Sequence, residues 1–442
     1  MMKVLFVSLG CDKNLVDSEV MLGILAKRGY IITDDETQAD IIIINTCCFI
    51  HDAKEESIAQ ILEMSELKKS GRVKALIVTG CMAQRYQEEI LEEIPEVDGV
   101  LGTNAYDDIG NMVDQVIKGE RAVNVKALTT IPKVEARRMV TTGGHYAYLK
   151  IAEGCDKHCT YCIIPSLRGS YRSVPMERLL LEAKELALGG VRELILVAQE
   201  TTVYGKDLYG EKRLPALLKE LAKIEELTWI RILYCYPEEI DEELIETIKT
   251  ENKVMNYLDL PIQHCNNEIL ARMGRRTSKK ELIQKIQMIR SAIPDICLRT
   301  SLITGFPGET SIQHEELLSF VKDIKFDRLG VFTYSREENT PAATMSCQVS
   351  EEIKLERQAE LMEMQQKIAF DASKEMVGRE VTVMIEGKLA DEDTYVGRTY
   401  KDAPNVDGLI FVDTIETYDT GDFVGVRVTE ALEYDLIGEI VE

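Results

Sequence analysis

The stretch HYAYLKIAEGCDKHCTYC, residues 145–162, decides the fold of the central part of this chain. It begins as a short apolar strand, continues through Gly154, and ends in three cysteines with the spacing CxxxCxxC, namely Cys155, Cys159 and Cys162. Three thiolates on one tight loop can bind three irons of a [4Fe–4S] cluster and leave the fourth iron without a protein ligand. The spacing therefore predicts an iron–sulfur site with one open, reactive iron.

A zinc site is the alternative for this loop, because His158 lies among the three cysteines and could supply a further ligand. A structural zinc ion takes four protein ligands, usually cysteine and histidine. The spacing alone favours the cluster, and the surrounding sequence strengthens that preference.

Strand and helix patterns alternate around this loop from residue 143 to residue 373. Five further strands are predicted after HYAYLKIAEG, namely VRELILVAQE, WIRILYCYP, MNYLDLPIQ, ICLRTSLITG and FDRLGVFTYS. Six strand–helix units of this kind suit a partial (β/α) barrel whose reactive face lies at the C-terminal strand ends. A helix that follows Ser350 is expected to close this region.

A three-cysteine loop on the first strand of a (β/α) barrel resembles the signature of the radical S-adenosylmethionine superfamily. The resemblance implies that the open iron chelates S-adenosylmethionine and that one electron from the reduced cluster cleaves this cofactor to a radical. We expect the cofactor pocket at the other strand ends. Its predicted residues are Gln199, Glu200, Gln263, Arg299, Thr304 and Gly305. An ordinary turn is the alternative around Gly305, because the run GFPGET is rich in glycine and proline.

The N-terminal residues 1–118 are predicted to form a doubly wound parallel α/β domain. Its buried strands are expected at residues 3–8, 39–45 and 74–79, and one cysteine follows closely on each, namely Cys11, Cys47 and Cys81. All C-terminal strand ends of a parallel sheet lie on one edge, so these thiols should meet in one crevice. We expect them to bind a second cluster, with core packing as the alternative. Packed thiols are expected for the remaining cysteines, Cys48, Cys235, Cys265, Cys297 and Cys347.

After residue 374 the apolar period changes to two, and short strands separated by turn residues predict a small antiparallel β-barrel over residues 374–442. Residues 119–142 show no clear period and are interpreted as a linker. The last 68 residues hold 17 acidic and 5 basic residues, a net charge of −12. A nucleic-acid-binding barrel should be basic. A basic protein partner therefore fits better than RNA.

The whole chain of 442 residues carries a formal net charge of −24 and 11 cysteines. Such a charge repels polyanions and disfavours a protein that holds nucleic acid mainly through phosphate contacts. No run approaches the roughly 18 apolar residues of a membrane span, and the N-terminus lacks signal-peptide features. We therefore expect a cytoplasmic protein with reduced thiols and no membrane partner.

The order of a three-cysteine α/β domain, a CxxxCxxC barrel and a small β-barrel resembles the methylthiotransferase family along essentially the whole chain. The terminal barrel resembles the TRAM domain of that family. The runs SLGCDKNLVDSE, RILYCYP, LDLPIQHCNNEILARMGR and TGFPGET resemble the branch that modifies a ribosomal protein, whereas the tRNA-modifying branch typically opens with GCQMN.

This resemblance implies two [4Fe–4S] clusters, S-adenosylmethionine as methyl donor and radical source, and addition of a methylthio group to the β-carbon of an aspartate in a basic small-subunit ribosomal protein. The substrate is the free protein or the 30S subunit, and the electron donor is a flavodoxin or ferredoxin. No catalytic residue beyond the cluster ligands, and no sulfur donor, is identified. The alternatives are a tRNA adenosine methylthiotransferase and a non-catalytic iron–sulfur carrier.

Overall fold

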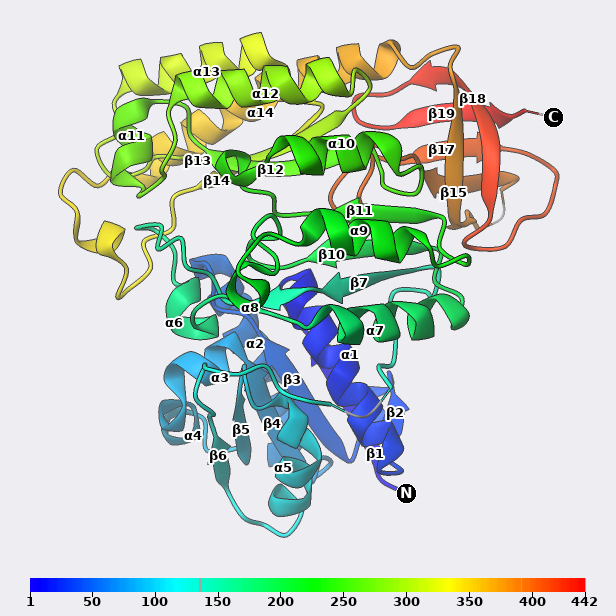
Figure 1. Ribbon diagram of the computed structural model, residues 1–442. Helices are drawn as coiled ribbons and strands as arrows, with labels where there is room; N and C mark the ends of the chain where they lie inside the picture. Colours follow the sequence, from blue (N-terminus) through cyan, green and yellow to red (C-terminus); the bar gives the residue numbers. More distant parts are fainter. Residues whose placement is uncertain (135–136, 391, 442) are drawn as a thin grey trace. The chain divides into compact units, whose positions relative to one another are not determined.

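The computed structural model describes residues 1–134, 137–390 and 392–441 of the chain. Its N-terminal part contains one six-stranded sheet in the order β2-β1-β3-β4-β5-β6 (Figure 1). The strands are β1 (Lys3–Ser8), β2 (Ile31–Thr33), β3 (Ile41–Thr46), β4 (Ala75–Gly80), β5 (Gly99–Gly102) and β6 (Ala122–Asn124). Every pair is parallel, so the predicted parallel sheet is confirmed.

Helices cover both faces of this sheet because its central strands are apolar on both sides. In β3, Ile42 and Ile44 pack in one apolar cluster with α2, α3 and α4, while Ile41 and Ile43 pack in another with α1 and α5. Successive side chains of a strand point to opposite faces, so four consecutive isoleucines fill two cores. The helices are α1 (Asp12–Lys27), α2 (His51–Lys69), α3 (Cys81–Tyr86), α4 (Glu88–Glu93) and α5 (Ile109–Val116). This is the predicted doubly wound arrangement.

Three strands of the sheet, β2, β5 and β6, are only three or four residues long and do not stand out as apolar runs. β6 extends the sheet into residues 119–142, the segment that we interpret as a linker. Pairing with β5 supplies regular structure there although the local sequence shows no period. The domain boundaries after residues 118, 142 and 373 stay predictions.

The central strands form two three-stranded sheets, β11-β10-β7 and β12-β13-β14. Backbone hydrogen bonds join the sheets, because the Met255 amide donates to the Ile230 carbonyl at 2.9 Å and the Cys235 amide donates to the Asp259 carbonyl at 2.8 Å. The strands are β7 (Tyr146–Lys150), β10 (Glu193–Val197), β11 (Trp229–Ile232), β12 (Tyr257–Gln263), β13 (Cys297–Thr304) and β14 (Arg328–Thr333). All six predicted strands are present, in the chain order of a partial (β/α) barrel.

Helices alternate with these strands along the chain. They are α7 (Met176–Leu188), α8 (Lys206–Tyr209), α9 (Leu214–Ala222), α10 (Glu242–Thr250), α11 (Asn267–Arg272), α12 (Lys279–Ala292), α13 (Ser311–Ile324) and α14 (Glu351–Lys374). α14 begins after Ser350, as predicted, and its Gln358 donates to the Val331 carbonyl of β14 at 2.7 Å.

The C-terminal part is a closed barrel in the order β15-β16-β17-β19-β18. Its strands are β15 (Glu380–Lys388), β16 (Thr394–Arg398), β17 (Ile410–Asp413), β18 (Phe423–Ala431) and β19 (Leu436–Ile440). The predicted small barrel is confirmed, with one correction to its topology: β17 and β19 pair in parallel, whereas the other pairs are antiparallel. Alternate residues such as Val383, Ile385 and Val426 fill its core.

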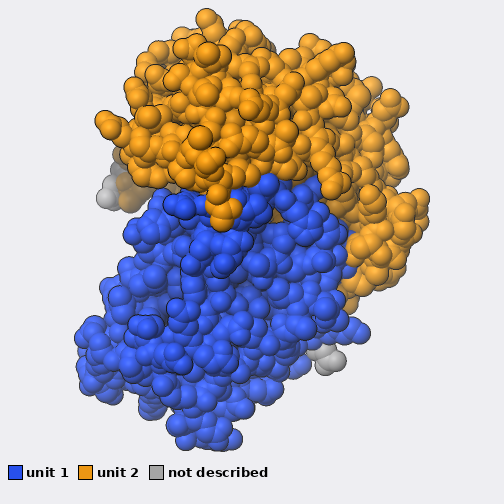
Figure 2. All heavy atoms as spheres, turned by 90° about the vertical axis from the view of Figure 1, so that its left-hand side faces the viewer, with its two compact units in different colours: residues 1–141, 150–174, 335–343 blue, residues 142–149, 175–334, 344–442 orange. Residues whose placement is uncertain are grey.

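The chain divides into two compact units that do not follow the chain order (Figure 2). Unit 1 comprises residues 1–141, 150–174 and 335–343, and unit 2 comprises residues 142–149, 175–334 and 344–442. The CxxxCxxC loop therefore belongs to the same unit as the N-terminal sheet. No helix in the described residues is long and apolar enough to cross a membrane.

Within unit 2, the terminal barrel is attached to the central strands through the buried carboxylate of Glu193. The Nε of Arg231 lies 2.7 Å from Oε1, and the Nη2 of Arg398 lies 2.7 Å from Oε2. All three side chains are essentially inaccessible to solvent. Burial alone raises the pKa of Glu193, but the two guanidinium groups outweigh it, and the pKa lies below its usual range.

Replacing Glu193 with alanine should destabilise unit 2 by roughly 3–5 kcal/mol, because two buried arginines then lose their common counter-charge. The midpoint of urea unfolding, followed by circular dichroism, measures this loss. Glu225 is exposed in the same unit, and its replacement by alanine is the matched control, with an expected change of at most about 0.5 kcal/mol. Equal midpoints for the two variants would contradict the structural role of Glu193.

Candidate iron–sulfur and cofactor site

Three cysteines of the N-terminal domain lie at the C-terminal ends of neighbouring parallel strands. Cys11 is the residue before α1 and follows β1, Cys47 directly follows β3, and Cys81 directly follows β4 as the first residue of α3. Because β3 lies between β1 and β4, the three positions share one sheet edge, as expected. Cys11 is exposed, and the other two are buried.

Two glycines show how closely these strand ends approach one another. At Gly10, whose φ is +87°, a Cβ atom would lie 2.6 Å from the Cβ of Cys47 and 3.0 Å from its Sγ. At Gly80, whose φ is +90°, a Cβ atom would lie 2.5 Å from the Thr46 carbonyl oxygen. Both positions combine a left-handed backbone with a contact that leaves no room for a side chain. The loops of Cys11 and Cys81 are therefore packed against the end of β3.

The three thiols of this triad also influence one another electrostatically. Burial, together with the neighbouring Cys81 and Cys11, raises the pKa of Cys47 to about 12. Burial likewise raises the pKa of Cys81, while Arg168 lowers it. Three soft sulfur donors at one sheet edge match the ligand preference of an iron–sulfur cluster, so the donor set fits this group.

The CxxxCxxC loop is held by its own backbone. The Cys155 amide donates to the Gly169 carbonyl at 3.1 Å, and the Cys162 amide donates to the Cys159 carbonyl at 3.0 Å. At Gly154, with a φ of +78°, a Cβ atom would lie only 2.2 Å from the Ser170 carbonyl oxygen. Burial raises the pKa of Cys162, and Cys159 and Cys155 raise it as well. This second set of three thiols also fits a cluster.

In the described part of the chain, no three His, Cys, Asp or Glu side chains surround a point where one metal ion could bind. A zinc site needs its ligands around one ion, whereas the thiolates of a [4Fe–4S] cluster each bind a different iron.

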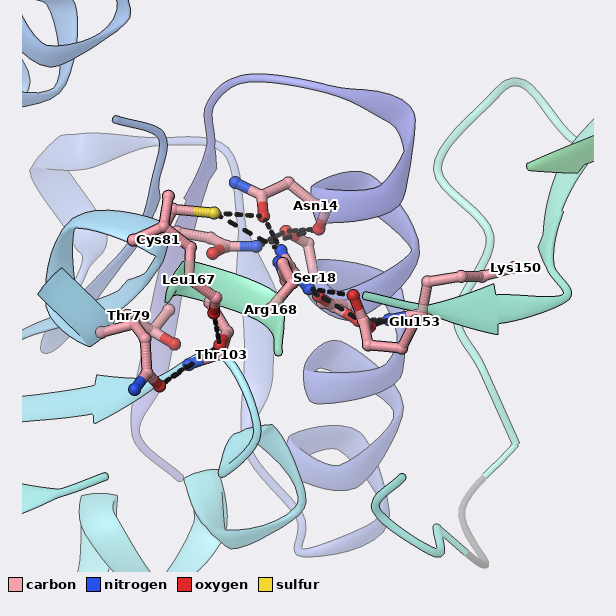
Figure 3. Close-up of polar contacts among 12 residues, drawn as sticks. Asn14, Ser18, Thr79, Cys81, Thr103, Lys150, Glu153, Leu167 and Arg168 are labelled. Carbon is pink, nitrogen blue, oxygen red and sulfur yellow. Dashed lines mark hydrogen bonds and ion pairs between the residues drawn. The ribbon is translucent and has the colours of Figure 1, made fainter. Parts of the chain in front are cut away.

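Packing joins the two cysteine triads within unit 1. α6 (Ile164–Arg168) follows the CxxxCxxC loop, and Ile163 and Leu167 belong to the same apolar cluster as Cys81. The hydroxyl of Thr103 also donates to the Leu167 carbonyl at 2.8 Å (Figure 3). The segment after the loop therefore packs on the N-terminal domain and not only on its own barrel.

A buried charge cluster, which the sequence does not reveal, lies beside Cys81. Two cations and two anions make it up, namely Arg168, Lys150, Asp17 and Glu153. Figure 3 shows Arg168 pointing toward Asn14, Glu153 and Cys81. Neither spacing nor composition marks these residues, because they come from three separate segments and meet only in the fold.

Residues 335–343 form a second connection that the sequence does not reveal. Glu337 is nearly inaccessible and lies 3.0 Å from both Arg85 of α3 and Lys54 of α2. Further along, the Ala342 amide donates to the Thr160 carbonyl inside the CxxxCxxC loop at 2.9 Å. The segment after β14 thus contacts the surroundings of both triads within unit 1.

In unit 2, five of the six predicted cofactor residues lie at C-terminal strand ends. Gln199 and Glu200 follow β10, Gln263 ends β12 with a φ of +72°, Thr304 ends β13, and Gly305 comes next. The turn after β13 is held by Glu309, whose carboxylate accepts from the Gly305 amide and, at 3.1 Å, from the Phe306 amide. The GFPGET run therefore forms a turn that directly follows the C-terminal end of β13.

Arg299 is the exception, and its predicted place at a strand end is wrong. It is the third residue of β13, near the start of the strand. Its Nη1 lies 2.9 Å from Asp259 and its Nε lies 3.4 Å from Asp407 of the terminal barrel. Ion pairing accounts for the position of this guanidinium, and a role of Arg299 in cofactor binding stays a prediction.

Four of the five remaining cysteines are buried as expected, namely Cys48, Cys235, Cys265 and Cys297. Cys347 is exposed, so its predicted packing is wrong. It lies in the loop before α14, where no apolar run gives it a core to join.

Models of three families match the chain. The uncharacterised protein family UPF0004 matches residues 3–102, the radical SAM superfamily matches residues 149–321, and the TRAM domain matches residues 377–441. The solved structure of the radical S-adenosylmethionine methyltransferase TsrM from Kitasatospora setae, with cobalamin and a [4Fe-4S] cluster bound, has a TM-score of 0.56 at 15% identity and covers 77% of this chain and 74% of its own. That likeness concerns the fold alone.

Two relatives share one name, ribosomal protein uS12 methylthiotransferase RimO. The relative from Lachnoclostridium phytofermentans is 63% identical over 437 residues, 99% of each chain. The relative from Clostridioides difficile is 48% identical over 441 residues, 100% of this chain and 99% of its own. Identity at this level over full length, with the radical SAM and TRAM regions both matched, shows that the chain belongs to the RimO family of radical S-adenosylmethionine methylthiotransferases.

Proposed function

We propose that this radical S-adenosylmethionine methylthiotransferase adds a methylthio group to the β-carbon of an aspartate in ribosomal protein uS12. The names of its full-length relatives support this substrate. The structural observation that carries the proposal is the presence, in one packing unit, of two separate triads of thiols. A reaction that breaks a C–H bond and also inserts sulfur requires a site for each task.

The first triad, Cys155, Cys159 and Cys162, would hold the cluster that binds S-adenosylmethionine, and the second, Cys11, Cys47 and Cys81, would hold an auxiliary cluster. When bound, the first cluster supplies an electron to S-adenosylmethionine and so a radical able to attack an unactivated C–H bond, for which acid–base catalysis is ill suited. Five of these six cysteines are at least half buried. Their loops limit access of water to the thiolates.

Residues at the strand ends of unit 2 are further candidates for binding the cofactor. We assign Gln199, Glu200, Gln263, Thr304 and Gly305 to this role, since they lie where a partial barrel has its reactive face. The peptide groups around Gly305 are fixed by Glu309, and the space that a side chain would take at Gly305 is filled by Lys354.

The charge of the terminal barrel supports a basic protein substrate, either free uS12 or the 30S subunit. Exposed carboxylates such as Asp413, Glu416 and Asp419 lie on its outer surface. A flavodoxin or ferredoxin would supply electrons. A tRNA substrate, as in the tRNA adenosine methylthiotransferases, is the alternative outcome of the tests below.

Replacing Cys155, Cys159 and Cys162 together with alanine should abolish production of 5′-deoxyadenosine and reduce the iron content by about half, because each triad holds its own cluster. Chromatography of the products after dithionite reduction measures cleavage, and colorimetric iron determination measures occupancy. Cys347 lies outside both triads, so Cys347→Ala is the matched control and should keep both values. Cofactor cleavage by the triple variant would refute the assignment.

Replacing Cys11, Cys47 and Cys81 together with alanine should leave 5′-deoxyadenosine production intact but eliminate the methylthiolated product, since the radical site does not need these thiols. Mass spectrometry of a uS12 peptide containing the target aspartate measures the product, with tRNA as the competing substrate in a parallel assay. Normal formation of methylthiolated peptide would show that this triad has no part in sulfur insertion. Modification of tRNA instead of the peptide would overturn the proposed substrate.

Changing Asp413, Glu416 and Asp419 to lysine should slow association with uS12 by about tenfold at low salt, because exposed charges act on encounter over a Debye length of about 8 Å at physiological salt. Stopped-flow rates at two ionic strengths measure the effect. The matched control changes Glu89, Glu92 and Glu93 of α4 to lysine, which alters the total charge equally but outside the barrel. Equal association rates for both variants and the unmodified protein would show that the acidic surface of the barrel has no part in substrate recognition. The acidic run DED at residues 391–393 also belongs to the barrel region, and its Asp391 lies outside the described residues.

A further inference from the structure

Arg168 belongs by its backbone to the CxxxCxxC loop. It is the last residue of α6, six positions after Cys162, and the next residue, Gly169, accepts the amide hydrogen of Cys155 at 3.1 Å. Gly169 has a φ of +75°, and a Cβ atom there would lie 2.7 Å from the Leu128 carbonyl oxygen, so this turn has little freedom. The position of Arg168 is therefore set by the same backbone that positions the first triad.

The side chain of Arg168 ends beside the other triad. Its Nη2 donates to the side-chain oxygen of Asn14 and lies 3.7 Å from the Sγ of Cys81, within hydrogen-bonding distance for sulfur. Asn14 is fixed as an acceptor toward Arg168, because its own Nδ2 donates to the carbonyls of Leu9 at 3.0 Å and Thr46 at 2.9 Å. An N–H group of Arg168 thus faces one sulfur of the second triad.

The positive charge of Arg168 is balanced without that sulfur. Its Nη1 lies 2.7 Å from Asp17 and 3.2 Å from Glu153, and Lys150 contacts the same two carboxylates. All four side chains are buried, so the group is a neutral tetrad of two cations and two anions. The contact to Cys81 is consequently an additional interaction that charge balance does not require.

We infer that Arg168 is a positioning residue that donates a hydrogen bond to the Cys81 thiolate and thereby raises the reduction potential of the auxiliary cluster. This inference rests on the proposed function, which assigns Cys81 to that cluster. Hydrogen bonds to ligand sulfurs are among the factors that set the potentials of iron–sulfur clusters. An N–H donor stabilises the reduced state, in which the sulfur carries more negative charge, and so favours uptake of one electron.

The consequence is a link between the two thiol triads. The loop that holds the first triad also supplies a donor to the second, so any shift of α6 changes the surroundings of Cys81. The apolar contacts of Ile163 and Leu167 with the cluster that contains Cys81 restrict such a shift.

The test uses full-length protein in which Cys155, Cys159 and Cys162 are alanine, so that only the auxiliary cluster is reconstituted with iron and sulfide. Two variants are compared in this background. Arg168→Lys keeps a cation for Asp17 and Glu153 but is too short to donate to the sulfur as well. The double variant Arg168→Gln with Asp17→Asn removes one charge of each sign and keeps the tetrad neutral.

A dithionite titration followed by electron paramagnetic resonance gives the midpoint potential, and iron analysis gives the occupancy. We expect a more negative midpoint in both variants with the iron content unchanged. The matched control is Arg138→Lys, because Arg138 is also buried and lies 3.1 Å from Glu19 of the same helix, α1. Its midpoint should equal that of the parent.

Unchanged midpoints in the two Arg168 variants would overturn the inference, as would unfolding of both, which would make the residue purely structural. If Arg168→Lys folds but loses its iron, while Arg138→Lys keeps its iron, the result supports the contact between Arg168 and Cys81. If the parent itself binds no iron, the assignment of the auxiliary cluster fails, and this failure belongs to the proposed function.

Discussion

The buried tetrad of Arg168, Lys150, Asp17 and Glu153 is the constraint on which the arrangement of unit 1 depends. Asp17 comes from α1 of the N-terminal domain, whereas the other three residues flank the CxxxCxxC loop. A charge buried without its partner costs several kcal/mol, so the loop cannot leave α1 without exposing or stranding these groups. Two thiol triads far apart in the sequence are held in one packing unit because their supporting segments share these charges and an apolar cluster.

In unit 2, buried ion pairs hold the terminal barrel against the central strands. Glu193 at the start of β10 joins Arg231 of the central strands to Arg398 of the terminal barrel, and Asp407 of that barrel pairs with Arg299. Glu193 is the first residue of β10 and Arg299 is the third of β13, whereas the predicted cofactor residues on these two strands end the strand or follow it. In barrels of this kind the opposite, C-terminal face carries the chemistry, so the terminal barrel can be anchored without occupying the reactive strand ends.

The sequence predicts the strands and cysteine positions that a local pattern determines. It does not predict the strand pairs and ion pairs that form only through tertiary contacts. β1 begins and ends where its apolar pattern places it, and the six cysteines lie at the predicted strand ends and loop. In contrast, β6 depends on pairing with β5, and β19 closes the barrel by a parallel pair that no local signal specifies. Arg299 illustrates the limit for site residues: a basic residue in a strand can serve a cofactor or an ion pair, and only the position of Asp407 decides between them.

The ion pairs of the terminal barrel also determine where its acidity can act. Its buried Arg398 and half-buried Lys401 pair with Glu193 and Asp327, while the buried carboxylates of Asp402 and Asp407 pair with Arg328 and Arg299. The charges that attach the barrel therefore cancel one another. The excess of carboxylates remains on the outer surface, on residues such as Asp413 and Glu416, where water and salt screen it but a basic partner can reach it. The acidity is thus available for recognition because the fold does not need it for attachment.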